Sequence, residues 1–274
     1  MARVLVFLAT RNEAGNVTSL LPAIRERVPD ADVLVVDDES NDGTVDAIRS
    51  LGLPRVTVIQ RRAGLGLGTA HVFALLHAMH HDYDAIVTMD ADLSHDPADI
   101  PVLLAALDAG ADLCVGSRYM AGGTCDYVGW RRFLSVAGNA AYRRVLGLPL
   151  HEFTTSLRAF RVSRLRSLDV GRLISNGYSF FTTTMAEAAM HGFAIAEVPI
   201  HFHKRGYGVS KIPPFEIFRA MRNLVRLRRR MRDAAAVLGD AKSCMPCAAC
   251  DVPYSFVGDG AGSGVCVSCG ARGP

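Results

Sequence analysis

The chain has 274 residues, 50% of them hydrophobic and 21% charged, with a formal net charge of +3. This composition excludes a disordered chain, and the length suits one large α/β domain with a small appendage. No segment approaches the roughly 18 apolar residues that a transmembrane helix needs. The apolar run Val4–Ala9 is too short for a secretory signal peptide, so we expect a cytoplasmic protein.

Short apolar runs alternate with segments of helical spacing in the first half of the chain. They predict strands at Arg3–Ala9, Ala31–Asp37, Val56–Gln60, Asp84–Met89 and Leu113–Gly116. This alternation is typical of parallel strands joined by crossover helices, and therefore of an α/β fold. Polar residues follow the strands at Thr10–Glu13, Asp37–Ser40 and Asp90–Asp92. Open α/β sheets bind ligands at this edge, so we expect a nucleotide-type site there.

The regular alternation ends after Tyr119. Gly122-Gly123 predicts a loop, and helical spacing follows over Trp130–Leu146 and Ser179–His191. Ala194–His203 predicts a further strand.

A basic amphipathic helix is predicted over Phe215–Asp233, directly after Pro213-Pro214. Phe218, Met221 and Val225 share one side of it, and seven arginines lie between Arg219 and Arg232. Such a helix can lie on an anionic membrane surface, or it can pack on its own domain with the arginines in water. Nucleic-acid binding is less favoured, because no aromatic residues interleave with the arginines.

Five of the seven cysteines are gathered at the carboxyl end. Two Cys-x-x-Cys pairs, Cys247 with Cys250 and Cys266 with Cys269, have the spacing of a four-cysteine zinc ribbon. Cys244 is an alternative member of the first pair. Four thiolates leave no open position on the metal, which favours a structural zinc over a catalytic one. A redox role is the remaining alternative.

Asp90 and Asp92 follow an apolar run that ends at Met89. At the end of a strand their side chains point the same way and can hold one divalent cation against a diphosphate. The alternative is a turn in which one aspartate caps the helix that begins near Pro97, a role that Asp96 also suits.

Six segments in one order resemble the inverting family 2 glycosyltransferases of GT-A fold, most closely the dolichol-phosphate or polyprenol-phosphate mannose synthases. The similarity covers Arg3 to about Ile217. The segments that carry it are Asn12-Glu13, Val36–Thr44, Gly64–Ala70, Asp90–Asp96, Gly116–Tyr119 with Gly122-Gly123, and Arg205–Lys211.

The resemblance implies a mostly parallel, Rossmann-like sheet flanked by helices. It also implies metal-dependent inverting transfer of a hexose, with mannose from GDP-mannose expected, to a polyprenyl or dolichyl phosphate at the cytoplasmic membrane face. The expected domains are a transferase domain over 1–212, divided into a nucleotide-sugar half (1–119) and an acceptor half (120–212), the basic helix over 213–237, and the zinc-ribbon-like tail over 242–274.

The resemblance also assigns roles to residues. Asp90, Asp92 and Arg118 are the expected catalytic residues, and Asp90 and Asp92 are expected to coordinate Mg²⁺ or Mn²⁺, with Ser94 as a weaker third ligand. The expected donor contacts are Ala9, Arg11, Glu13, Val36, Asp38, Asp90, Ala91, Asp92, Arg118, Arg205 and Lys211.

The acceptor phosphate is expected at Arg118, Arg131, Ser135 and Arg205. Arg131, Ser135 and Asn139 recur at i, i+4 and i+8 and therefore share one helix face. A lipid monophosphate, with a second pKa of about 6, is already anionic at neutral pH and needs no general base.

Two departures from the family pattern bear on the sugar and the base. The first loop runs Ala9-Thr10-Arg11-Asn12-Glu13 instead of Pro-Thr-Tyr-Asn-Glu, so Arg11 is expected to stack in place of an aromatic partner. Asp-x-Thr-Ser-Gly-Phe-Arg becomes the segment Glu152–Arg158 and loses its glycine. A related transferase using UDP-glucose, another donor or another acceptor is therefore an alternative. A non-catalytic scaffold acting through the zinc ribbon is a further one, against which Asp90 and Asp92 count.

Three local alternatives stay open on the nucleotide side. Asp38 ends the second strand and can accept hydrogen bonds from a nucleoside, whereas Asp42 contacts the nucleoside or only caps a helix. Gly64–Gly68 forms either a flexible loop near the donor or a simple turn. It does not follow the first strand, which argues against a dinucleotide fingerprint.

Overall fold

The computed structural model describes residues 2–173, 179–207 and 221–232, and the short ranges 256–258, 264–266 and 272–273. The chain divides into two compact units, Met1–Val225 and Arg226–Pro274. None of the described helices combines the length and the apolar character needed to cross a bilayer.

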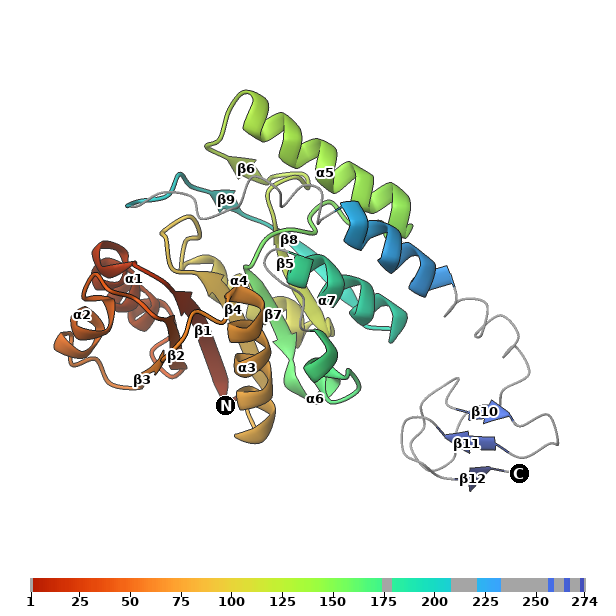
Figure 1. The fold of residues 1–274 in the computed structure, drawn as a ribbon, viewed down its shortest axis with the longest axis horizontal. Helices are drawn as coiled ribbons and strands as arrows, with labels where there is room; N and C mark the ends of the chain where they lie inside the picture. The colour runs from red at the N-terminus through yellow and green to blue at the C-terminus, as the bar shows by residue number, and fades with distance from the viewer. Residues whose placement is uncertain are drawn as a thin grey trace. The chain divides into compact units, whose positions relative to one another are not determined.

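A seven-stranded sheet in the order β3-β2-β1-β4-β7-β5-β8 organises the first unit (Figure 1). Its strands are β1 (Val4–Thr10), β2 (Asp32–Asp38), β3 (Val56–Arg61), β4 (Ala85–Asp90), β5 (Leu113–Ser117), β7 (Arg158–Arg161) and β8 (Ile195–Pro199). The five strands predicted in the first half are confirmed to within one residue at each end. All pairings are parallel except those that β7 makes with β4 and β5.

Helices cover both faces of this sheet. They are α1 (Ala14–Arg27), α2 (Thr44–Ser50), α3 (Leu67–His80), α4 (Asp99–Asp108), α5 (Trp130–Leu146), α6 (Val162–Leu165) and α7 (Ser179–Met190), with a 3₁₀ turn η1 (Val170–Leu173). Residues 221–232 form a further helix, which confirms that part of the predicted basic helix. The predicted helix over Trp130–Leu146 has the observed bounds, and the one over Ser179–His191 ends one residue early.

Alternate side chains of β1 point to opposite sides of the sheet and are buried there. Val6 and Leu8 pack in one core with α1 and α4, whose buried side chains include Leu21 and Leu103. Phe7 points the other way, to His71 of α3, which also contacts Phe180 and Phe181 of α7. The side chains on both faces of β1 are therefore buried, as is typical of strands in a parallel sheet.

The predicted strand Ala194–His203 is two strands in the structure. β8 ends at Pro199, and β9 (His201–Phe202) pairs with β6 (Thr124–Cys125) in a separate two-stranded sheet. Pro199 lies in the edge strand β8, where a missing N–H is tolerated, and the pairing with β5 continues one residue beyond it. The next amide, of Ile200, donates to the Ser117 carbonyl, and the Ile200 carbonyl then accepts from Thr124. The chain thereby leaves the main sheet.

The second unit contains a small antiparallel sheet of β10 (Phe256–Gly258), β11 (Gly264–Cys266) and β12 (Arg272–Gly273). Of the predicted zinc ligands, Cys247, Cys250 and Cys269 lie outside the described residues, as does Cys244. Only the backbone of Cys266 is described. The zinc ribbon therefore stays a prediction.

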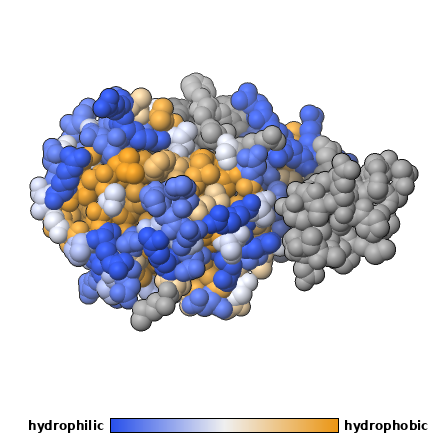
Figure 2. All heavy atoms as spheres, turned by 90° about the horizontal axis from the view of Figure 1, so that it is seen from below, coloured by the Kyte–Doolittle hydropathy of each residue, from blue (hydrophilic) through white to orange (hydrophobic). Residues whose placement is uncertain are grey.

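Apolar side chains also reach the surface of the first unit. Seen from below, they gather across the middle of the described part, and hydrophilic residues border them (Figure 2). The exposed apolar residues of the first unit include Phe73 and Leu76 of α3, and Phe133, Leu134 and Val136 of α5.

Burial of His71 makes the fold sensitive to acid. Burial lowers the pKa of this imidazole from 6.5 to about 4, and its Nδ1 lies 3.0 Å from the Leu67 carbonyl oxygen. Between these pH values the unfolded chain binds more protons than the native one, so stability falls as the pH decreases. From about pH 7.5 to about pH 5, urea denaturation should show that the wild type loses about 2 kcal/mol more than His71→Leu.

His80, an exposed histidine of the same helix, provides the control. His80→Gln should keep the acid sensitivity of the wild type. An equal loss of stability in wild type and His71→Leu would show that His71 does not titrate with folding.

Candidate active site

The acidic pair Asp90 and Asp92 lies at the carboxyl end of β4. Asp90 is the last residue of the strand and lies opposite Ala9 of β1, which in turn lies opposite Val36 of β2. Asp92 Oδ1 accepts hydrogen bonds from the amide and the hydroxyl of Ser94. In the turn before α4 it is Asp96 whose Oδ1 accepts from the Ala98 amide, and no side chain caps the helix itself. Asp90 and Asp92 are thus not needed as caps.

Arg205 joins this acidic loop to the first loop of the sheet. Its Nη2 lies 2.7 Å from Asp92 Oδ2, and its Nη1 lies 3.3 Å from Glu13 Oε1. The backbone fixes the same segment, because the His203 amide donates to the Ser94 carbonyl and the Gly206 amide to the Asp92 carbonyl. Of the predicted donor residues, Glu13, Asp92 and Arg205 are therefore in direct contact.

The charge balance of the pair suits a hard divalent cation. Burial and the neighbouring Asp92 raise the pKa of Asp90, while Arg205 and Arg118 act in the opposite direction. The Asp90 side chain is 33% exposed and the Asp92 side chain 10% exposed, so one carboxylate is accessible and the other is enclosed. Two carboxylates and the Ser94 hydroxyl are oxygen donors, which Mg²⁺ and Mn²⁺ prefer.

The imidazole of His95 is neutral and is hydrogen-bonded to the acidic loop. Burial lowers the pKa of His95 to about 4. Its Nδ1 accepts a hydrogen bond from the Asp90 amide, which leaves the proton on Nε2, 3.2 Å from Thr155 Oγ1. The ring therefore links the end of β4 to the segment before β7.

Arg118 is held by a partner that the sequence did not assign to it. Its Nε and Nη2 lie 2.7 and 3.0 Å from the two carboxylate oxygens of Glu152, and Nη2 also donates to Thr154 Oγ1. Burial alone would raise the pKa of Glu152, but the Arg118 charge and hydrogen bonds hold it below its usual range. The guanidinium also lies over the rings of Tyr119 and Phe202.

On the nucleotide side, Asp38 is occupied by the glycine-rich loop. Its two oxygens accept from the Leu65 and Gly66 amides, and Arg61 lies 2.8 Å from Oδ1. Gly66 has a φ of 88°, which explains the glycine. The loop follows β3 and leads into α3, so the dinucleotide alternative does not apply. Asp38 anchors the loop in this structure, and its predicted nucleoside contact stays untested.

Other predicted donor residues lie at the same edge. Val36 and Ala91 are buried, Ala9 is half-buried, and Arg11 is exposed. Asp42 accepts from the amides of Ala14 and Thr44 and so ties two loops together. Lys211 lies outside the described residues.

The acceptor prediction rests on one face of α5. Asn139 is buried, and its amide group donates to the Ser135 carbonyl and accepts from the Phe153 amide. The expected face therefore exists and contacts the Glu152–Arg158 segment. The side chain of Arg131 lies outside the described part of the chain. Glu152, His95 and Arg61 are the site residues that sequence reasoning missed; of these, Glu152 and His95 had a signal, because each lies in a segment that was compared with the family pattern.

Comparison with known proteins identifies the family. Residues 5–168 match the model of glycosyl transferase family 2. The chain belongs to this family. A polyprenol monophosphomannose synthase from Mycolicibacterium smegmatis is 40% identical over 223 residues, which cover 80% of this chain and 84% of that protein. An undecaprenyl-phosphate mannosyltransferase from Micrococcus luteus is 39% identical, with 86% and 99% covered.

Solved structures agree with the α/β GT-A fold. A glucosyl-3-phosphoglycerate synthase from Mycobacterium tuberculosis, in complex with Mn²⁺, UDP and phosphoglyceric acid, superposes with a TM-score of 0.61 at 22% identity, covering 84% of this chain and 78% of that one. A mannosyltransferase from Pyrobaculum calidifontis with GDP-Man and Mn²⁺ gives 0.53 at 22% identity, with 89% and 76% covered. The family 2 protein described here is a glycosyltransferase with this fold.

Removing one partner of the buried Arg118–Glu152 pair should destabilise the transferase strongly. Glu152 is fully buried, so Glu152→Ala leaves a nearly buried guanidinium without its partner. We expect a loss of about 3–5 kcal/mol in the free energy of unfolding, measured by urea denaturation.

Arg55→Ala is the matched control, because it removes an ion pair with Asp32 that is largely exposed. Its cost should stay within about 1 kcal/mol. Equal costs for the two variants would mean that burial does not strengthen the Arg118–Glu152 pair.

Proposed function

We propose that this family 2 transferase moves mannose from GDP-mannose to a polyprenyl phosphate at a membrane surface, with inversion and with a divalent cation. The observation that carries the proposal is the pair of relatives near 40% identity, both named as mannosyl transferases of a polyprenyl phosphate type. The mannosyltransferase from Pyrobaculum calidifontis, whose structure contains GDP-Man and Mn²⁺, supports the donor and the metal by analogy of fold.

The acidic loop fits the proposed cation. Asp90, Asp92 and Ser94 would hold it, and it would supply Lewis-acid neutralisation of the charge that grows on the leaving GDP. Arg205, between Glu13 and Asp92, carries a positive charge beside the same groups. The chain's own contribution is to orient the diphosphate so that the sugar carbon faces the acceptor.

No general base is required in this proposal. A polyprenyl monophosphate offers an anionic oxygen at neutral pH, with a second pKa of about 6. Attack of that oxygen on C1 forms the new C–O bond as the bond to GDP breaks, with inversion. The Arg205 and Arg118 guanidiniums and the face of α5 that carries Ser135 are the groups that we assign to the acceptor phosphate.

Membrane contact is supported by exposed apolar groups beside basic ones. On and before α5, Val128 is 77% exposed and Phe133 is 71% exposed. In the helix over 221–232, Met221 and Val225 are exposed beside Arg222. Apolar side chains that enter the interface and arginines that meet anionic lipid are the two components of peripheral binding.

The reaction can be tested with the purified full chain, polyprenyl phosphate, Mg²⁺ or Mn²⁺, and a panel of GDP- and UDP-sugars. We expect mass spectrometry to detect a mannosyl lipid phosphate when GDP-mannose is the donor and with no other sugar nucleotide of the panel. Addition of EDTA should abolish this product. Asp92→Asn should lower kcat at least about 100-fold, because it removes charge where the diphosphate and cation meet.

Asp96→Asn is the matched control, since Asp96 lies in the same loop but is exposed and accepts a hydrogen bond from the Ala98 amide. It should retain activity close to wild type. If a product formed only with UDP-glucose, the donor would be UDP-glucose and not GDP-mannose. No product with any donor, in a mixture where a known synthase works, would refute the function.

Peripheral binding can be tested by sedimentation with anionic vesicles. Binding should weaken as salt rises, and Phe133→Ser should lower the partition coefficient about tenfold, because a largely exposed phenyl ring no longer enters the interface. Phe73→Ser, at an exposed phenylalanine of α3, is the control and should bind like the wild type. Equal binding of Phe133→Ser and wild type would exclude α5 from the contact.

A further inference from the structure

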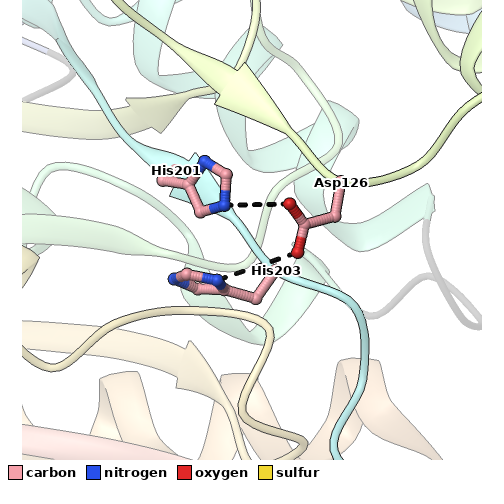
Figure 3. A group of neighbouring side chains, drawn as sticks. All are labelled: Asp126, His201 and His203. Carbon is pink, nitrogen blue, oxygen red and sulfur yellow. Dashed lines mark ion pairs between the residues drawn. The ribbon is translucent and has the colours of Figure 1, made fainter.

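Two histidines and an aspartate meet on the outer side of the small β6–β9 sheet. Asp126 follows β6, and His201 and His203 lie in and after β9 (Figure 3). One ligand atom from each of the three side chains lies within 4.8 Å of the others. His201 Nε2 is 3.0 Å from Asp126 Oδ1, and His203 Nδ1 is 3.8 Å from Asp126 Oδ2.

The alternation of β9 explains why the two imidazoles point the same way. Residues two apart on a strand share a face, so His201 and His203 lie together and Phe202 points to the opposite side. There Phe202 packs against His95 and under the Arg118 guanidinium. The two rings of the pair are 4.2 Å apart at their centroids.

The backbone also fixes Asp126. Its amide donates to the Phe202 carbonyl, and its Oδ2 accepts from the Lys204 amide. This last hydrogen bond helps to lower the pKa of Asp126, so the carboxylate is charged at neutral pH. The His201 Nδ1 has a hydrogen-bonding partner in Thr124 Oγ1, 2.5 Å away. A metal-bound histidine typically donates its other ring N–H to such an oxygen.

We propose that Asp126, His201 and His203 bind one divalent transition-metal ion, with zinc as the expected occupant. Two imidazoles and one carboxylate suit zinc and its neighbours in the first row better than magnesium or calcium. Ligand atoms around a tetrahedral zinc are about 3.3 Å apart, given bonds of about 2.0 Å. The 3.0 Å and 3.8 Å separations run to different oxygens of Asp126, and the three ligand atoms lie within 4.8 Å of one another, so the side chains would have to close in by up to about 1.5 Å around the ion.

The three side chains are between 36% and 44% exposed. An ion could therefore reach the site from solvent, and water would complete its coordination. This site is separate from the acidic pair at the end of β4, which offers only oxygen ligands.

The ion would fasten the segment that presents Arg205. His203 donates its amide to the Ser94 carbonyl, and Gly206 donates to the Asp92 carbonyl, so this segment lies along the acidic loop. A bound ion would reinforce the link that strand pairing already makes between this segment and β6. The role we assign is that of a structural clamp, and it stands whether or not the proposed mannosyl transfer is correct.

Zinc binding is tested by equilibrium dialysis of the full chain with Zn²⁺ at neutral pH and excess Mg²⁺, followed by metal analysis. His201→Gln, His203→Gln and Asp126→Asn should each bind one zinc fewer per chain than the wild type. His191→Gln, at an exposed histidine whose Nδ1 lies 2.9 Å from the Glu187 carbonyl oxygen, should bind the wild-type number. Because the carboxyl-terminal cysteines are unchanged in all variants, the difference reports this site alone.

Thermal unfolding provides a second measurement. Zinc should raise the melting temperature of the wild type more than that of His203→Gln, because an ion that binds only the native site stabilises it. Equal zinc stoichiometry in wild type and His203→Gln would overturn the proposal and leave Asp126 as an ion-pair partner of the two histidines.

Discussion

The structure depends on balancing the carboxylates that collect at one edge of a parallel sheet. Parallel strands all end at the same edge, so Asp38 and the Asp90–Asp92 pair are brought close together by topology alone. Each needs compensation, and the cations come from elsewhere in the chain. Arg61 pairs with Asp38, and Arg205 reaches both Asp92 and Glu13, a residue 192 positions away in sequence. The acidic edge therefore holds together segments from both ends of the first unit.

The antiparallel strand β7 extends this organisation to the acceptor side. It lies between β4 and β5, and the segment before it contacts the acidic loop through Thr155 and His95. Arg158 is fully buried and donates to the carbonyls of Phe153, Thr155 and Phe181. These bonds fix the turn that carries Glu152, which in turn holds Arg118. Arg158, which bonds to backbone carbonyls, thus supports Arg118, which bonds to the Glu152 carboxylate.

Sequence patterns predicted the helices and strands better than the side-chain contacts between them. The strands from β1 to β5 and the helix α5 follow clear periodicity, and their bounds agree closely with the predictions. β7 was not predicted, because Arg158-Ala159-Phe160-Arg161 is short and begins and ends with arginine; its burial depends on carbonyl acceptors that only the fold supplies. The pairing of Arg118 with Glu152 was also missed, since nothing in a single sequence measures a distance across 34 positions.

The strand β9 shows how a short element connects an outer surface to the proposed chemistry. Phe202 contacts Arg118 on the inner side, and the next amide bonds to the Ser94 carbonyl of the acidic loop. His201 of β9 and His203 directly after it point to the opposite side from Phe202. Any interaction that restrains this outer face also restrains the backbone from which Arg205 extends, because only one residue separates His203 from Arg205. Side chains that touch neither donor nor acceptor can therefore influence how firmly the acidic loop is held.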